Sequence, residues 1–323
     1  MKTLLLTDLH FNTKPLGILK AQTRCVLSII IEEEPEEVII LGDLMMHRKP
    51  TPTVLLALKE VVDFLYEKRI PLIILRGNHD SETKADDGVT ALSLFSYHAK
   101  VVTQTWFDYK TKRAFIPHYE NEETIKRHLE SITPGYTVFG HFGYSGCLNS
   151  VGDADFHIML GNFTTCTYLG HIHKYSQKDN VTILGTPYTT NFGECGKENL
   201  YGLLYSDGSV EFKPVKSGPR HLVVDHSQIA DKLEYINDPN WFTLLRILID
   251  SDASPIPYDE LEVGFLDIKW KPSFDEDHLS SYQPKRDLFS INEMIVEDYI
   301  DAAQTNLKRE DIMEGYSLLK HED

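Results

Sequence analysis

Five short apolar runs in this chain each end at residues of the kinds that bind metal ions, and this pattern most constrains the fold. Each run is rich in Val, Ile, Leu or Tyr and lacks alternation, which is typical of a strand buried on both faces. In an open α/β sheet, ligands bind beyond the carboxyl ends of the strands. The runs are LLLTDLH, VIILGDL, LIILRGNHD, TVFGHF and TYLGHIH. We therefore expect one site formed by Asp8, His10, Asp43, Asn78, His79, His141, His171 and His173.

The chemistry of these side chains predicts a centre with two metal ions. Imidazole, carboxylate and amide oxygen suit manganese, iron or zinc better than calcium. Eight candidate residues are too many for one ion. Two ions about 4 Å apart, bridged by one carboxylate, would activate a water molecule and hold the oxygens of a phosphoester. The four cysteines, Cys25, Cys147, Cys166 and Cys195, lack Cys-x-x-Cys spacing, which argues against a zinc ribbon or a disulfide framework.

Each motif alone has an ordinary alternative explanation. A single Gly-Asp or Asp-x-His pair mostly arises by chance, and the segment Asn78-His79-Asp80 after a glycine also suits a turn. A set of independent turns would not be expected to supply only metal-binding residues at five strand ends. The recurrence therefore favours the two-metal interpretation.

The same motifs resemble those of the calcineurin-like metallophosphoesterases over about the first 200 residues. Two further segments look like the SbcD-type DNA double-strand-break repair nuclease branch, and phage-encoded recombination nuclease subunits are the most similar. The matching motifs are Asp8-x-His10, Gly42-Asp43, Gly77-Asn78-His79-Asp80, Gly140-His141 and Gly170-His171-x-His173. The two SbcD-like segments are Lys49-Pro50-Thr51-Pro52, and Gly185-Thr186-Pro187 leading to Phe192-Gly193-Glu194.

The resemblance implies a role for each residue. Manganese is the expected metal, with magnesium or iron as alternatives. His79 would not bind metal; next to the second ion it would stabilise developing charge or protonate the leaving oxygen. The first ion would be held by Asp8, His10, Asp43 and His173, and the second by Asp43, Asn78, His141 and His171, with Asp43 bridging.

One position departs from the family pattern. Related enzymes often carry an acidic residue or histidine three positions after the bridging aspartate, where Met46 stands here. Either His47 or Asp80 would then orient the catalytic His79. His118, in the turn FIPHYE, is a weaker candidate for the rim of the site.

The spacing of apolar residues predicts an α/β fold. We expect a helix that ends near Glu34, a strand at 37–41, a helix at 53–69 and a strand at 71–76, which makes the sheet partly parallel. Together with the family resemblance, this predicts a metallophosphoesterase sandwich of two mixed sheets flanked by helices. Further strands are expected at 113–116, 136–139, 166–169, 181–184, 200–206 and 209–215.

Three regions are expected along the chain: a phosphoesterase domain at 1–217, a small α/β capping domain at 218–280 and a helical tail at 284–323. The tail contains two expected helices, at 290–306 and 309–319, with an apolar stripe. This stripe either packs on its own chain or, as the resemblance implies, binds the coiled-coil base of an SbcC-like ABC-type ATPase. The stripe includes Phe289, Ile291, Met294, Ile295, Tyr299, Ile300, Ile312, Tyr316 and Leu319.

The net charge of −17 is unfavourable for DNA binding, because it repels the phosphate backbone. Two divalent ions would add about +4 at the site, and short basic patches at 47–49 and 126–127 are available for phosphate contacts. We expect much of the DNA affinity to come from a partner. The apolar stretches are far shorter than a membrane span and the chain starts directly with a strand, so we expect a cytoplasmic protein, in the host cytoplasm if viral.

Three functions remain open. We favour a metal-dependent DNA exonuclease or endonuclease subunit that acts with an SbcC-like ATPase in DNA recombination, repair or replication. The alternatives are a free-standing metallophosphatase or cyclic-nucleotide phosphodiesterase, and a noncatalytic scaffold, although no ligand is missing. The resemblance also implies a homodimer, paired through helix 53–69 and the neighbouring Val89, Leu92, Leu94 and Phe95.

Overall fold

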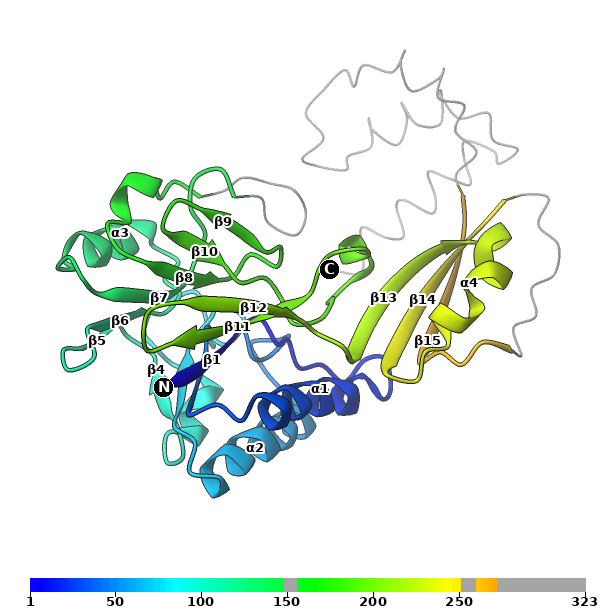
Figure 1. Ribbon diagram of the computed structural model, residues 1–323, viewed down its shortest axis with the longest axis horizontal. Helices are drawn as coiled ribbons and strands as arrows, with labels where there is room; N and C mark the ends of the chain where they lie inside the picture. Colours follow the sequence, from blue (N-terminus) through cyan, green and yellow to red (C-terminus); the bar gives the residue numbers. More distant parts are fainter. Residues whose placement is uncertain (148–155, 251–259, 272–323) are drawn as a thin grey trace, which may run out of the picture. The chain divides into compact units, whose positions relative to one another are not determined.

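The computed structural model describes residues 1–147, 156–250 and 260–271. The first of its two larger sheets has six strands, and β1 to β4 run parallel to one another. Strand β11 pairs antiparallel with β1, and β12 antiparallel with β11, so the sheet is mixed. The strand order is β12 (Val210–Pro214), β11 (Leu200–Tyr205), β1 (Lys2–Leu6), β2 (Glu37–Ile40), β3 (Leu72–Leu75) and β4 (Lys100–Val102) (Figure 1).

The second six-stranded sheet is also mixed. Its central strands are parallel, and β5 and β9 pair antiparallel at its two edges. The two sheets share one buried apolar cluster, in which Leu5 and Ile39 of the first sheet meet Phe139 of the second. The prediction of two mixed sheets packed face to face is therefore confirmed. The strand order is β5 (Trp106–Asp108), β6 (Arg113–Ile116), β7 (Thr137–His141), β8 (Thr167–Gly170), β10 (Val181–Ile183) and β9 (Ser176–Lys178).

Helices cover the outer faces of the sheets. Helices α1 (Ile18–Glu33) and α2 (Pro52–Glu67) pack on the first sheet, and α3 (Glu122–Glu130) packs on the second. Helix α2 begins at Thr51, whose hydroxyl accepts a hydrogen bond from the Val54 amide. The Lys-Pro-Thr-Pro segment thus acts locally as a helix start. Short 3-10 turns lie at η1 (Ala91–Phe95), η2 (Leu160–Asn162), η3 (Phe192–Glu194) and η4 (His226–Gln228).

A smaller parallel sheet follows the second large one along the chain. It contains β13 (Gly218–Asp225), β14 (Trp241–Ile249) and β15 (Phe265–Trp270), with helix α4 (Ile229–Ile236) between the first two strands. Its apolar core is separate from those of the larger sheets. These are the elements expected for the small α/β module.

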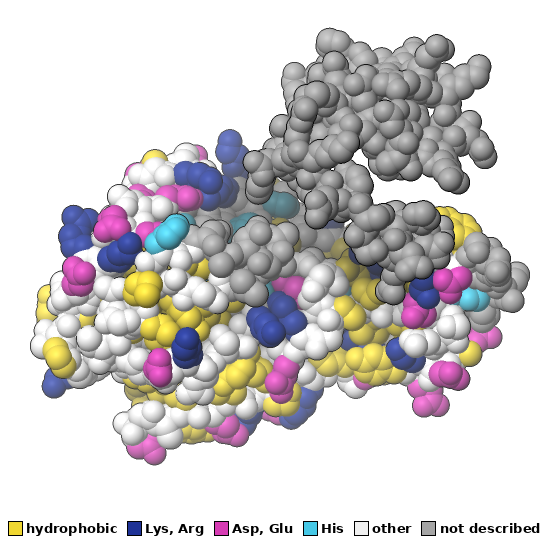
Figure 2. All heavy atoms as spheres, turned by 90° about the horizontal axis from the view of Figure 1, so that it is seen from above, with side chains coloured by type: hydrophobic (Ala, Val, Ile, Leu, Met, Phe, Trp, Pro, Cys, Tyr) yellow, Lys and Arg dark blue, Asp and Glu magenta, His cyan; other side chains and the backbone are white. Residues whose placement is uncertain are grey.

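Residues Met1–Lys271 form one compact unit. The predicted division into domains at 217 and 280 stays a prediction, and the expected tail helices lie outside the described residues. Within the described ranges, the model contains no helix with the length and apolar character needed to cross a bilayer. On the face shown in Figure 2, Lys and Arg side chains of the described residues lie in small groups between Asp and Glu side chains.

Candidate metal centre

The five strand-end segments meet at one place, as predicted. Parallel strands present their carboxyl ends at the same edge of a sheet, and the two sheets are packed so that these edges adjoin. The first, second and third strands supply Asp8, Asp43 and the pair Asn78-His79, while β7 ends at His141. Three groups of side chains with potential ligand atoms within 4.8 Å of one another result. The first group is Asp8, His10 and His173, and the second is Asp43, His141 and His171; a third, His10, Asp43 and His79, shares one residue with each of them.

In the first group, two imidazoles face the same point. The Nε2 atoms of His10 and His173 lie 3.0 Å apart, and Asp8 Oδ1 lies 3.8 Å from each of them. Donor atoms bound to one ion at 2.0–2.2 Å are separated by about 3–3.5 Å. The spacing of the two imidazoles fits a shared cation, and Asp8 Oδ1 is only slightly farther away. Asp8 Oδ1 is buried without a hydrogen-bond partner. A buried, unpartnered carboxylate oxygen is costly, and a cation would satisfy it.

The second group gathers around an amide oxygen. Asn78 Oδ1 lies 3.1 Å from His141 Nε2 and 2.9 Å from His171 Nδ1. Asp43 Oδ1 lies 3.4 Å from His141 Nε2. Nitrogen and oxygen ligands of this kind match a first-row divalent metal.

Asp43 lies between the two groups. Its Oδ2 atom is 3.7 Å from His10 Nε2 of the first group, while its Oδ1 atom approaches His141 of the second. One carboxylate therefore presents an oxygen to each group, which is the arrangement of a bridging ligand. The residues present fit a pair of divalent ions.

The backbone of the site is held in an unfavourable conformation. The four site residues Asp8, His10, Asp43 and His171 have φ angles of 52°, 43°, 52° and 83°. Residues other than glycine rarely adopt this left-handed region, which costs about 1–3 kcal/mol each and is concentrated at functional sites. Hydrogen bonds between neighbouring loops stabilise it: the Asp8 amide donates to the Gly42 carbonyl at 2.9 Å and the His10 amide to the Asp43 carbonyl at 2.9 Å.

The glycines before the site residues make room for side chains. A Cβ atom at Gly77 would overlap the Asp43 carboxylate, and a Cβ atom at Gly42 would overlap the His141 ring. Gly42 also has a φ angle of 100°. The Gly-Asp and Gly-Asn-His motifs therefore have a steric reason for their glycines.

Two buried partners fix the orientation of metal-facing histidines. The Nδ1 atom of His141 donates to the Leu41 carbonyl at 2.5 Å, and Nδ1 of His173 donates to Glu194 Oε1 at 2.6 Å. In each case Nε2 is left for a metal, as in the carboxylate–histidine–metal arrangement. In the sequence Glu194 stands out only as part of a motif, because no spacing signal links it to His173.

His79 is oriented by a main-chain group. Its Nδ1 atom lies 2.7 Å from the Met46 carbonyl oxygen, so neither of the two expected side chains, His47 or Asp80, is this partner. The carboxylate of Asp80 instead accepts hydrogen bonds from three backbone amides that join the loops after β2 and β3, those of Gly77, Leu44 and Met45.

The His79 ring lies close to the first group. Its centroid is 4.9 Å from that of His10, and its place next to the second ion, which the resemblance implies, stays a prediction. The Met46 contact and the bond from the His79 amide to Asp43 Oδ1, at 2.8 Å, hold it there.

Burial and opposite charges set the protonation of the site. Burial lowers the pKa of His10 to about 3, so its ring is neutral and presents a lone pair. Burial alone would raise the pKa of Asp43, but His141 and the other histidines hold it well below its usual range. Burial opposes a charge on His141 as well, yet the Asp43 carboxylate raises its pKa to about 9. A cation bound here would displace that proton.

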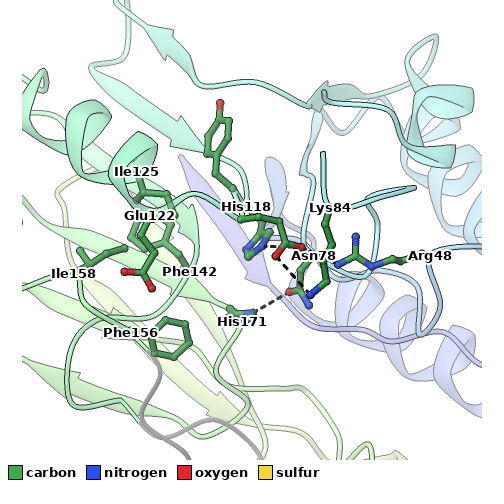
Figure 3. Close-up of a pocket in the computed structure, with 12 residues that line it drawn as sticks. Arg48, Asn78, Lys84, His118, Glu122, Ile125, Phe142, Phe156, Ile158 and His171 are labelled. Carbon is green, nitrogen blue, oxygen red and sulfur yellow. Dashed lines mark hydrogen bonds and ion pairs between the residues drawn. The ribbon is translucent and has the colours of Figure 1, made fainter. Parts of the chain in front are cut away.

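His118 lies beside the second group, as expected for a rim residue. Its ring centroid is 5.6 Å from that of His171 and 6.2 Å from that of His141. Together with Asn78 and His171 it lines a cavity of about 270 Å³. Figure 3 shows this cavity, with Arg48 and Lys84 on one side of His118 and Glu122 and Phe142 on the other.

The fold and the site can be compared with known proteins. Among solved structures, a novel archaeal phosphodiesterase is 14% identical, with a TM-score of 0.35 over 66% of this chain and 99% of that one. The nuclease MPE of Pseudomonas putida is 17% identical, with a TM-score of 0.30 over 67% and 82%. A dimetal phosphatase from Danio rerio is 12% identical, with a TM-score of 0.37 over 67% and 99%.

A family model supplies the stronger comparison. The model of the calcineurin-like phosphoesterases matches residues 1–247, which include every residue of the two ligand groups. This family uses metal ions to hydrolyse phosphoesters, in agreement with the donor set that the structure brings together. The chain belongs to the calcineurin-like phosphoesterase family.

Proposed function

We propose that this protein is a manganese-dependent DNA nuclease subunit that acts with an SbcC-like ATPase in the cytoplasm, or in the host cytoplasm if the protein is viral. The observation that carries the chemistry is the position of Asp43, with one carboxylate oxygen toward each of two histidine-rich groups. Two bound ions would supply a nucleophile at neutral pH and clamp the attacking and leaving oxygens of a phosphodiester.

We assign metal binding and transition-state stabilisation to different residues of this chain. Asp8, His10 and His173 bind at the first position, and Asn78, His141 and His171 at the second. His79 receives a fixed orientation because its Nδ1 atom bonds to the Met46 carbonyl. Its Nε2 atom is then free to stabilise charge on the phosphoryl group or to donate a proton to the leaving oxygen.

The small module supports a nuclease over a minimal phosphatase, because it is connected to the metal centre. On β13, the His221 amide donates to the Thr189 hydroxyl at 2.7 Å, in the segment that leads to Glu194. On β14, the Arg246 guanidinium lies 4.1 Å from the Phe192 ring centroid. A phosphatase for small substrates has little need of such a module beside its ligands.

An assay with several substrates tests this proposal. The manganese-loaded protein is given linear duplex DNA, single-stranded DNA, a cyclic nucleotide, bis-p-nitrophenyl phosphate and p-nitrophenyl phosphate. We expect cleavage of DNA and of the diester, and loss of both in Asp43→Asn. Preference for the monoester or the cyclic nucleotide, with DNA untouched, would favour the alternative of a free-standing metallophosphatase or cyclic-nucleotide phosphodiesterase, with which the net charge of −17 also agrees.

Deletion of the C-terminal tail tests whether the protein binds an SbcC-like ATPase through it. Deletion of residues 284–323 is expected to leave hydrolysis of bis-p-nitrophenyl phosphate within about twofold, because every described ligand lies before residue 200. It should abolish co-purification with an SbcC-like ATPase and ATP-stimulated degradation of duplex DNA. Polar substitutions at Ile291, Ile295 and Tyr299 are a milder test of the same contact, and we expect them to weaken binding of the ATPase. A truncated protein that still binds the ATPase would place the contact elsewhere.

A further inference from the structure

His118 has a fixed position that the proposed chemistry does not yet use. It lies between β6 and α3, and its main chain is tied to the end of β3. The His118 amide donates to the Arg76 carbonyl at 2.9 Å, and the Arg76 guanidinium donates to the His118 carbonyl at 2.5 Å. Because Arg76 directly precedes the Gly77-Asn78 turn, the His118 backbone is held in register with the second ligand group.

The ring nitrogens of His118 are buried and lack hydrogen-bond partners among the described residues. Both ring nitrogens are inaccessible and neither makes a hydrogen bond in the described part of the chain. The nearest carboxylate oxygen, on Glu120, is 3.9 Å from Nε2, which is too far for a hydrogen bond. A neutral imidazole always carries one N–H donor. A buried donor without a partner costs about 1–3 kcal/mol, so this ring calls for an explanation.

The ring of His118 lies outside the groups of candidate ligands. The described groups with ligand atoms within 4.8 Å of one another do not include His118. Its ring nevertheless lies beside two histidines of the second group. A group bound at that position would therefore come next to His118 and outside the ligand atoms themselves.

A cavity continues from this point toward solvent. Asn78, His118 and His171 line this cavity beside the second group, and Arg48 and Lys84, whose side chains are 29% and 79% exposed, line it as well (Figure 3). The Arg48 guanidinium is held by the Thr83 carbonyl at 2.7 Å and by Glu120 at 3.0 Å. Phe142 and Phe156 supply an apolar side. The cavity thus offers hydrogen-bond donors beside the second group and mixed polar and apolar walls elsewhere.

We propose that His118 is a further substrate-binding residue, whose ring N–H donates a hydrogen bond to a non-bridging phosphoryl oxygen bound at the second ligand group. The cavity would then receive the group esterified to that phosphorus. This inference rests on the proposed phosphoester chemistry and is independent of whether the ester is DNA. It gives the buried donor an anionic acceptor, and hydrogen bonds to charged groups are the stronger ones.

The direct test is binding of inorganic phosphate, measured by calorimetry on manganese-loaded and metal-free protein. His118→Phe keeps a ring but removes the donor, and His118→Asn keeps an N–H donor. We expect the phosphate affinity of His118→Phe to fall about 10- to 100-fold, the loss expected for a hydrogen bond to a charged group. His118→Asn should recover most of it. Manganese stoichiometry should stay at the wild-type value in both variants.

The second readout is hydrolysis of bis-p-nitrophenyl phosphate and of its phosphorothioate analogue. The kcat/KM of His118→Phe should fall about 10- to 100-fold for the oxygen ester and by a smaller factor when sulfur, a weak acceptor, replaces the contacted oxygen. Lys216→Ala is the control. It removes an exposed side chain outside the cavity, and we expect wild-type kcat/KM for both esters.

Two outcomes would overturn the inference. One is wild-type phosphate affinity in His118→Phe. The other is loss of manganese or of thermal stability in both His118 variants, which would make the residue structural. If the wild-type protein binds phosphate through His118 but cleaves no phosphoester, the proposed function fails and the inference stands.

Discussion

At the scale of single residues, two of the site's histidines depend on supports outside the set of candidate ligands. The candidate ligands themselves directly follow apolar runs, so the sequence places them at strand ends. Glu194 and the Met46 carbonyl, which orient His173 and His79, have no such signal. Glu194 follows the last histidine pair by a loop whose path depends on tertiary packing. Met46 contributes a main-chain oxygen, which every residue type carries.

The division of roles between two histidines is testable. His79→Ala should lower kcat by about 10²–10⁴-fold, the range for a positioned acid or hydrogen-bond donor, and leave two manganese ions per chain. His141→Ala should instead lose the second ion, because Nε2 of His141 faces Asp43 and Asn78. Elemental analysis after gel filtration measures the metal content. Equal metal loss in both variants would show that His79 is a ligand.

The buried partner of His173 gives a second prediction. Glu194 accepts from His173 Nδ1, and although burial opposes its charge, this contact lowers the pKa of Glu194 to about 2. Glu194→Gln should weaken manganese binding by about 10- to 100-fold, the usual effect of removing a group that orients a ligand. Competition with a fluorescent chelator measures it. Glu198→Gln, at an exposed carboxylate in the same segment, is the control, and equal weakening there would point to a general loop effect.

At the scale of elements, the strands that are buried on both faces were predictable from the sequence, and the short, partly exposed strands were not. Strands β2 and β3 are buried throughout and β1 is buried from Thr3 onward, and each contains a continuous apolar run. Strands β4, β5 and β9 have three residues each and are partly exposed, so they leave no comparable pattern. Helix α3 was missed because Ile125 and Leu129 are its only buried residues, which is too short a stripe.

The contact between the small module and the Glu194 segment predicts a pH effect. Burial lowers the pKa of His221 to about 4, so this histidine is neutral in the folded protein. The unfolded chain binds the proton from about pH 6.5 downward. The stabilisation is therefore complete above pH 6.5 and is lost as the pH falls toward 4, by at most about 3 kcal/mol.

Urea unfolding followed by tryptophan fluorescence, to which Trp241 on β14 contributes, measures this loss. His221→Gln should lose less stability between pH 7 and 4.5 than the wild type does. His157→Gln, at a histidine whose side chain is 81% exposed, should follow the wild type. Equal pH dependence in all three proteins would mean that other groups cause the acid sensitivity.

At the scale of the whole molecule, the charge and the exposed apolar surface have different consequences. The chain carries 32 basic and 49 acidic residues, and its visible cations are interspersed with acids (Figure 2). This composition disfavours tight DNA binding by the isolated chain. The exposed apolar side chains instead favour association with protein, since contiguous patches of this kind mark interaction surfaces.

The predicted homodimer has a candidate surface on α2 and the segment after it. Leu56, Leu94 and Tyr97 are 66%, 70% and 91% exposed, and all three line one apolar cavity of about 420 Å³. Leu92 and Phe95, which were also expected on this face, are buried in the core of the first sheet; of the two, Phe95 still lines the cavity and Leu92 does not.

We therefore expect Leu56→Glu and Leu94→Glu to shift the protein from dimer to monomer, because each buries a charge in an apolar contact. Light scattering at tens of micromolar measures the mass. Tyr109→Glu is the control, because Tyr109 is 77% exposed but lies after β5, outside this surface. The diesterase activity of the monomeric variants should stay close to that of the wild type, since every described ligand comes from one chain. A wild-type monomer at this concentration, alone and with the ATPase, would contradict the dimer and leave this apolar face to a different partner.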